Sequence, residues 1–318
     1  MKNKSLTICF VVGIVLAFLP VMIHAQPSVW RIASLFMLSL IIAAGLHFVT
    51  GMAKVISLCH VAFCGVGAYA AGRLSISLGM PPLLAVIFGA AIAGGVALIL
   101  AWITLSLEDY YLTLATLAAS EILSNLFRSW TAVTGGENGL ISVPPLSLLN
   151  ISLAAPALYY VVCTIAAIGA IMLILVLEKS AFGKSLRAVG DADILVESLG
   201  LRRNVLRLLA FAIGGALAGL AGGIAAHMDG FVGPESFGVS QSVSYLCFLV
   251  IGGLGRLRGV IGAAVFAVIA TDLLRGFQGW QMVILSVLVI LTLCWNSRNP
   301  YSLPRRPFFL CRTKPAVE

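Results

Sequence analysis

Long apolar runs, separated by short polar segments, follow one another along almost the whole chain. An α-helix needs about 20 mostly apolar residues to cross the hydrocarbon core of a bilayer. Several runs reach that length, so the pattern predicts an all-α, polytopic transmembrane helix bundle with about ten spans. We place the spans at 6–23, 32–50, 55–72, 82–107, 111–130, 154–177, 205–227, 240–253, 259–275 and 280–295.

Three of these spans have unusual features. The segments 55–72 and 240–253 are short or rich in Gly and Ser, which predicts broken or re-entrant helices. The run 6–23 follows Lys2 and Lys4 and therefore resembles a signal peptide. Its apolar stretch is longer than a usual signal core, so we interpret residues 1–30 as a retained first transmembrane helix.

The distribution of Lys and Arg predicts how the bundle is oriented. Cytoplasmic loops of membrane proteins carry an excess of these two residues. If the N-terminus is inside and the spans alternate, only four of the 20 Lys and Arg residues fall outside, namely Arg31, Arg73, Arg128 and Arg275. The sequence therefore predicts that both termini are cytoplasmic and that the number of spans is even.

The composition agrees with a membrane protein. Of the 318 residues 60% are hydrophobic and 10% are charged, whereas a soluble domain carries roughly 25% charged residues. In a soluble protein a net charge of +8 would suggest nucleic-acid binding. Here it comes largely from the inside loops, so we expect contact with the lipid bilayer and no nucleic acid. We predict a permease-type membrane domain over 31–297 and a basic cytoplasmic tail over 298–318.

Motifs for enzyme chemistry are incomplete in this sequence. Gly183, Lys184 and Ser185 match the end of a nucleotide-binding P-loop, but Glu178 stands where its first glycine belongs. Gly253 and Gly255 would need a third glycine at 258 for a dinucleotide fingerprint, and that residue is Arg258. We expect no enzyme activity and no cofactor bound by this chain. ATP-driven transport would need ATP and Mg²⁺ on separate ATPase subunits.

The seven cysteines do not suggest disulfides or a metal site. Six of them lie in apolar stretches, and their spacing follows no disulfide framework. Cys59, His60 and Cys64 are close in sequence, but Cys59 and His60 would point about 100° apart on a helix. We therefore expect buried small side chains and no metal.

Polar side chains inside the predicted spans are the main candidates for function, because they are costly in a bilayer. Lys54, Ser57 and His60 cluster at the start of the third span, and Glu121 lies near the middle of the fifth. One interpretation is a substrate pathway through the bundle. The alternative is a set of hydrogen bonds that lock helices together.

Two connecting segments are long enough to contact other proteins. Residues 131–152 are expected outside, and 178–204 are expected inside and carry both signs of charge. Within the inside loop, Asp191 or Asp193 is placed to cap a short helix over 194–199 that ends at Gly200. Such a helix would offer a surface to a soluble partner; the alternative is a solvated connector.

Four stretches of the chain carry a pattern in which order and spacing matter more than any single motif. They are Ser57-Leu58-Cys59-His60-Val61-Ala62-Phe63 with Gly65, Gly67, Ala68 and Tyr69; Tyr111 through Thr116-Leu117-Ala118 to Glu121-Ile122; Thr134-Gly135-Gly136-Glu137-Asn138-Gly139-Leu140; and Phe182-Gly183, Arg187-Ala188 and Glu197 to Gly200, continuing into 218–222, Pro234 and 251–264. Over roughly 30–295 the chain resembles the LivM-type permeases of branched-chain amino acid ABC importers.

The resemblance implies a permease subunit that moves branched-chain amino acids (Leu, Ile and Val) across the inner membrane of a bacterium by alternating access. Its partners would be a second, LivH-like permease subunit, two cytoplasmic ATPase subunits and a periplasmic substrate-binding protein. We assign candidate residues to three roles. The substrate pathway would use Lys54, Ser57, His60, Phe63, Thr116 and Glu121; the outer loop Thr134, Gly135, Gly136, Asn138 and Gly139; and ATPase coupling Arg187, Asp191, Ile194, Glu197, Leu199 and Gly200.

Four positions depart from the family pattern. Lys54 and Cys59 stand where glycine is usual, Asp109 replaces a glycine, and Glu137 replaces a proline. These changes affect the expected substrate more than the expected fold. Two alternatives therefore stay open: the same kind of importer for urea, short amides or another small solute, and an ion-coupled secondary transporter with Glu121 and Lys54 as its relay.

Overall fold

A computed structural model describes the chain over residues 26–104, 107, 109–148, 151–152, 155–191, 200, 202–253, 255, 257–273, 283 and 287. The predicted first span, the last span at 280–295 and the basic tail therefore lie wholly or almost wholly outside the described residues. So do Ile194, Glu197 and Leu199.

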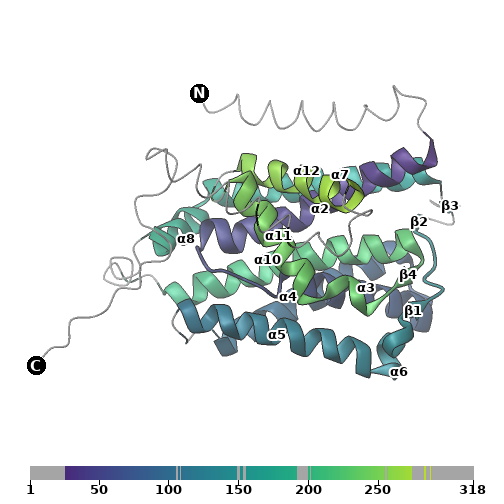
Figure 1. Cartoon of the computed structure of the whole chain (residues 1–318), viewed down its shortest axis with the longest axis horizontal. Helices are drawn as coiled ribbons and strands as arrows, with labels where there is room; N and C mark the ends of the chain where they lie inside the picture. Colours follow the sequence, from purple (N-terminus) through teal and green to yellow (C-terminus); the bar gives the residue numbers. More distant parts are fainter. Residues whose placement is uncertain are drawn as a thin grey trace, which may run out of the picture.

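Helices make up most of the described chain, which confirms the all-α bundle (Figure 1). Among the residues that the structure describes, five helical segments are long and apolar enough to cross a membrane, namely 27–52, 60–78, 82–104, 156–179 and 203–229. The helices are α2 (Pro27–Leu46), α3 (His60–Leu78), α4 (Pro82–Thr104), α5 (Asp109–Ser129), α6 (Thr131–Thr134), α7 (Pro156–Lys179), α8 (Ala181–Asp191), α10 (Arg203–Asp229), α11 (Val239–Gly252) and α12 (Leu257–Leu273).

The helix α2 lies in the middle of the bundle. Its membrane-length segment, 27–52, is the most buried of the five candidate spans, and it contacts α7, α10 and α12. Helix α10 also packs closely against α3 and α4. Gly67, Gly89 and Gly219 bring these three helices together, because a Cβ at each position would overlap a neighbouring backbone or side chain. Small residues permit this close backbone approach in membrane bundles.

The predicted third span starts later than the sequence suggested. Helix α2 continues into a π-helical turn, η1 (His47–Met52), and a connector over 53–59 then leads into α3. Lys54 in this connector has a positive φ of 53°. The prediction of a span at 55–72 was therefore misplaced: α3 is continuous over 60–78, and the interruption precedes it.

The two ends of the bundle differ (Figure 1). One, the α6 end, carries α6, η2 (Gly136–Asn138) and η3 (Pro234–Phe237). It also carries two small antiparallel strand pairs, β1 (Leu140–Ile141) with β4 (Phe231–Val232) and β2 (Ser147–Leu148) with β3 (Ile151–Ser152). The other, the α8 end, carries η1, the connector and α8. The positive-inside rule predicts that the α6 end faces outward and that the α8 end faces the cytoplasm.

The helix described in the inside loop is α8, which precedes the helix expected at 194–199. Ser180 caps it, since its hydroxyl accepts a hydrogen bond from the Gly183 N–H at 3.2 Å. Asp191 is the last residue of α8. The helix expected at 194–199, and with it the choice between Asp191 and Asp193 as its cap, lies outside the described residues. Gly200 is a turn residue with φ of 77°.

Candidate functional site

Helix α5 exposes a polar stripe to the outside of this chain. Its inward face carries Leu112, Thr116, Ser120, Ser124 and Phe127, all buried. The opposite face exposes residues at helical spacing, and three of them are polar or charged. These exposed residues are Tyr110, Leu114, Leu117, Glu121, Asn125 and Arg128.

Glu121 therefore does not lie in the interior of this chain. A hydrogen bond that locks two helices of the chain together would require it to be there. Helix α5 runs along the edge of the bundle (Figure 1), and it makes few contacts with the other helices. Helix α5 is not among the five candidate spans found in the described residues. If it crosses the bilayer, as the sequence predicts for 111–130, a carboxylate and an amide that face lipid would be costly. The arrangement favours a face that is covered by another subunit or that borders water.

The other predicted pathway residues near α3 are buried. Ser57, His60 and Phe63 are each 1% exposed. The His60 Nε2 atom lies 3.2 Å from the carbonyl oxygen of Ile42, and its ring packs beside Gly45 and Gly214, which belong to α2 and α10. In this structure His60 thus ties α3 to α2, which is what the lock interpretation describes.

Thr116 links the connector to α5. Its hydroxyl accepts a hydrogen bond from the backbone N–H of Leu58 at 3.2 Å and donates one to the Thr113 carbonyl at 2.8 Å. Thr116 is fully buried, and it lies a little more than one turn before Glu121 on the same helix. The connector is therefore in direct contact with the helix that carries the exposed polar stripe.

Lys54 contacts the coupling segment and lies away from the exposed face of α5. Its ammonium forms an ion pair with the carboxylate of Asp191 at the end of α8. Both side chains are partly exposed, Lys54 at 30% and Asp191 at 65%. The structure thus joins a residue assigned to the pathway with a residue assigned to ATPase coupling.

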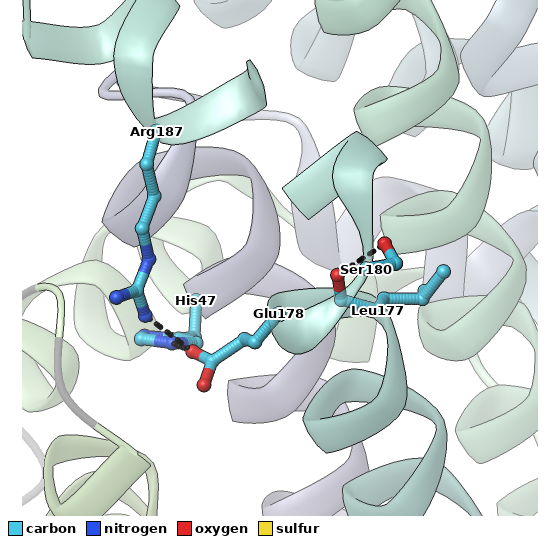
Figure 2. Close-up of polar contacts among 5 residues, drawn as sticks. All are labelled: His47, Leu177, Glu178, Ser180 and Arg187. Atoms are coloured by element: carbon cyan, nitrogen blue, oxygen red, sulfur yellow. Dashed lines mark hydrogen bonds and ion pairs between the residues drawn. The ribbon is translucent and has the colours of Figure 1, made fainter. Parts of the chain in front are cut away.

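A second polar cluster at the α8 end joins α7, α8 and η1 through one carboxylate (Figure 2). The Oε1 atom of Glu178 lies 2.8 Å from the Arg187 guanidinium and 3.2 Å from Nε2 of His47. His47 is fully buried, while the Glu178 side chain is 16% exposed. Neighbouring Ser180 donates a separate hydrogen bond to the Leu177 carbonyl at 2.6 Å.

Apolar contacts hold the same elements together. The rings of Phe48 in η1 and Phe182 in α8 are stacked with centroids 6.0 Å apart. Gly190 of α8 faces the Met52 carbonyl so closely that a Cβ would lie 2.6 Å from that oxygen. The start and the end of α8 are therefore both seated on η1.

His47 and Glu178 were not among the residues selected from the sequence. His47 is the only ionisable residue of the predicted span 32–50, and Glu178 is the only acidic residue of the long helix α7. An isolated charge at the end of a span is a common feature of membrane helices. The sequence therefore contained the residues but no sign that they meet Arg187.

The predicted outer loop forms the rigid rim of the α6 end. The Thr134 hydroxyl caps the end of α5 by donating to the carbonyls of Phe127 and Trp130 at 2.7 Å each. Gly135, Gly136 and Gly139 all have φ between 67° and 80°, a region that favours glycine. Glu137 and Asn138 are exposed at the tip.

A cavity of about 650 Å³ lies between α2, α3, α10 and α11 on the side of the α6 end. The Arg31 guanidinium and the Asp229 carboxylate, 2.9 Å apart, form an exposed ion pair on its wall. The hydroxyls of Ser39 and Tyr245 lie 3.1 Å apart further along α2. A volume of this size accommodates a small solute.

The apolar helices of membrane-spanning length among the described residues show that this is a polytopic helical membrane protein. A family model described as branched-chain amino acid transport system / permease component matches residues 28–293. The chain belongs to that family. It is accordingly an ABC-type permease subunit, a multi-pass protein of the bacterial inner membrane.

Comparisons with individual proteins agree. The chain is 28% identical over 297 residues to the high-affinity branched-chain amino acid transport system permease protein LivM of Escherichia coli K12, covering 86% of this chain and 70% of LivM. The Salmonella typhimurium LivM gives the same identity and coverage. The autoinducer 2 import system permease protein LsrC of Escherichia coli O9:H4 is 32% identical over 206 residues, covering 60% of this chain and 57% of LsrC.

One solved structure shows a weaker likeness. PsaBC from Streptococcus pneumoniae in complex with Fab matches at 14% identity and a TM-score of 0.43, covering 82% of this chain and 89% of that chain.

Proposed function

We propose that this chain is the membrane-spanning permease of an ATP-driven importer for branched-chain amino acids. The observation that carries the proposal is the family match over 28–293 together with the similarity to LivM over 86% of the chain. In the proposed assembly, ATP is hydrolysed by two cytoplasmic ATPase subunits, and a periplasmic binding protein delivers the solute. A second, LivH-like permease completes the membrane part.

The exposed stripe on α5 supports the second permease. Glu121, Asn125 and Arg128 stand on one exposed side of a helix whose other side is packed. A partner subunit on this face would remove Glu121 and Asn125 from lipid and enclose a polar passage between the two chains. In this assignment Glu121 borders the solute pathway, while Ser57, His60 and Phe63 support it from the interior of this chain.

The first experiment combines purification with transport. The importer is purified from native membranes in mild detergent, and its subunits are identified. The complex is then reconstituted into vesicles, with ATP supplied on the side of the membrane that carries the ATPase subunits. We expect a second permease and an ATPase pair in near-equal amounts, and ATP-dependent uptake of L-leucine when the binding protein is present. Purification of the chain alone, or with itself only, would contradict the proposal.

A Glu121→Gln variant tests the pathway assignment. If Glu121 borders a polar passage, loss of its charge changes the rate or selectivity of L-leucine uptake and leaves the subunit composition intact. The matched control is Ile122→Leu, an exposed apolar neighbour on the same helix. Unchanged uptake in Glu121→Gln would exclude a role for its charge in transport.

The similarity to LsrC favours a second candidate solute. LsrC belongs to an autoinducer 2 import system, so this chain is a candidate importer of a small polar solute of that kind. Competition against L-leucine uptake distinguishes the two: inhibition by isoleucine and valine supports branched-chain amino acids, and inhibition by autoinducer 2 alone supports the second. Membership in an ABC permease family argues against the remaining alternative, an ion-coupled secondary transporter that uses Glu121 and Lys54 as its relay.

A further inference from the structure

The end of α2 that contacts α8 has an unusual backbone. Residues His47–Met52 form a π-helical turn, η1, at the point where the central helix of the bundle ends. Single π-helical turns inside α-helices are rare and occur frequently at functional sites. Conversion of such a turn to regular α-helix would shift the register of the chain that follows it, so a π-helical turn at this place offers a simple way to move the connector.

Helix α8 is attached at four points along its length, three of them on this turn and one on the connector that follows it. Phe182 stacks on Phe48, Arg187 reaches His47 through Glu178, and Gly190 lies against the Met52 carbonyl. Asp191 holds Lys54, two residues beyond η1. Because α8 touches η1 at both ends, a rigid movement of α8 moves the turn or breaks these contacts.

The chain that leaves η1 runs to the buried face of α5. The connector over 53–59 ends at α3, and the Leu58 N–H is held by the Thr116 hydroxyl of α5. Thr116 lies five residues before Glu121 on that helix. The contacts therefore form one continuous path from α8 through η1 and the connector to the buried face of α5, the helix that carries Glu121 on its exposed side.

The carboxylate of Glu178 is the central contact of this path. It accepts from the exposed Arg187 of α8 on one side and lies against the fully buried His47 ring on the other (Figure 2). His47 Nδ1 has no hydrogen-bond partner among the described residues. Within that part of the chain, the imidazole therefore makes its polar contact through Nε2, with Glu178. A single group thus ties the surface helix to the core.

We propose that the His47–Glu178–Arg187 contact is the joint through which movement of α8 switches the π-helical turn and, through the connector and Thr116, the exposed face of α5. Glu178 and His47 act as positioning residues, since neither contacts the solute. This inference rests on the proposed function, and it takes α8 as the segment that the ATPase subunits move.

The test uses the complete reconstituted importer. Glu178→Gln keeps the shape of the side chain and removes its charge. We expect ATP hydrolysis to continue while L-leucine uptake per ATP hydrolysed falls about tenfold, because the joint no longer transmits the movement. Lys179→Gln, which removes the neighbouring exposed charge outside the cluster, is the matched control and should leave the ratio unchanged.

Two further variants separate a joint from a merely structural contact. If the three residues act as one unit, Glu178→Gln combined with Arg187→Gln should be no worse than the more severe single variant. His47→Gln, which keeps a side-chain N–H, should retain more coupled uptake than His47→Leu. Equal losses of hydrolysis and uptake in all variants, or loss of subunit assembly, would show a structural role and overturn the proposal.

A measurement that needs no solute keeps the joint distinct from the proposed function. Amide hydrogen exchange over 47–59 is compared in the assembled complex with and without trapped ATP. We expect an ATP-dependent change in the wild type that is absent in Glu178→Gln. If the wild-type complex shows this change in exchange but takes up no L-leucine, the proposed solute is wrong and the proposed joint stands. If exchange over 47–59 does not change with ATP, the proposed joint is wrong.

Discussion

Single residues determine how closely the helices of this bundle approach one another. Gly67 of α3 faces Gly219 of α10, and a Cβ on Gly67 would overlap the Gly219 backbone. Lipid provides no hydrophobic drive for helix association, so contacts of this kind carry much of the packing energy. Gly95, by contrast, has open space around it.

Gly67→Ala should therefore destabilise the protein by about 1–3 kcal/mol, because the added methyl forces two backbones apart. The measurement is the unfolding free energy or the melting midpoint in detergent. Gly95→Ala is the matched control on α4 and should be neutral or slightly stabilising, since alanine favours helix more than glycine does. Equal effects of the two substitutions would contradict the close contact.

Tyr159 provides a second test at the scale of one residue. Its hydroxyl accepts from the Leu146 N–H at 2.8 Å and donates to the His227 carbonyl. Tyr159→Phe leaves both buried backbone groups without this partner, which should cost about 1–3 kcal/mol. Tyr110→Phe, which removes a hydroxyl from a largely exposed ring, should change the melting midpoint little; a similar loss in both would refute the assignment.

At the scale of the element, α8 is an amphipathic helix seated on the bundle by one apolar face. Phe182, Leu186 and Val189 follow helical spacing toward the protein, and Leu186 and Val189 are buried. Lys184 and Arg187 lie on the exposed side. The Lys54–Asp191 pair is too exposed to add more than about 0–1 kcal/mol, so the apolar face provides most of the attachment.

Leu186→Ala should consequently weaken the attachment of α8 by about 2–5 kcal/mol, because the side chain is fully buried. Hydrogen exchange of the α8 amides in the purified protein measures this, with faster exchange expected over 181–191. Lys184→Ala on the exposed side should leave exchange unchanged. Protection that survives Leu186→Ala would mean that the polar contacts hold the helix.

At the scale of the whole molecule, the positive-inside rule assigns the α8 end to the cytoplasm and the α6 end to the outside. Glu137 is exposed at the α6 end, and Lys184 is exposed at the α8 end. We therefore choose Glu137 and Lys184 as the positions for a labelling experiment, one at each end of the bundle.

In a variant without native cysteines, Glu137→Cys should react with a membrane-impermeant thiol reagent added to intact spheroplasts. Lys184→Cys should react only after the membrane is permeabilised, because the reagent cannot reach the cytoplasm. Mass spectrometry or a fluorescent label measures the extent of reaction. The opposite labelling pattern would invert the predicted orientation, and labelling of both positions from one side would change the number of spans between them.

Sequence reasoning located the helices well where their apolar runs were long and uninterrupted. The predicted span at 82–107 corresponds to α4 over 82–104, and 154–177 corresponds to α7 over 156–179. It was less accurate at the junction of the predicted spans 32–50 and 55–72, where His47–Met52 forms a π-helical turn and α3 begins only at His60. Hydrophobicity indicates which residues lie within the bilayer. It carries little information on whether their backbone is α-helical, π-helical or extended.

The sequence by itself determined the class of protein, the approximate spans, the expected orientation and the family resemblance, because bilayer thickness and the cost of burying charge act on every residue independently. Only the tertiary structure decided which polar residues meet. Glu178 lies 131 residues from His47, and Lys54 lies 137 residues from Asp191. Such contacts depend on how helices far apart in the chain pack together, and so do the burial of His60 and the exposure of Glu121.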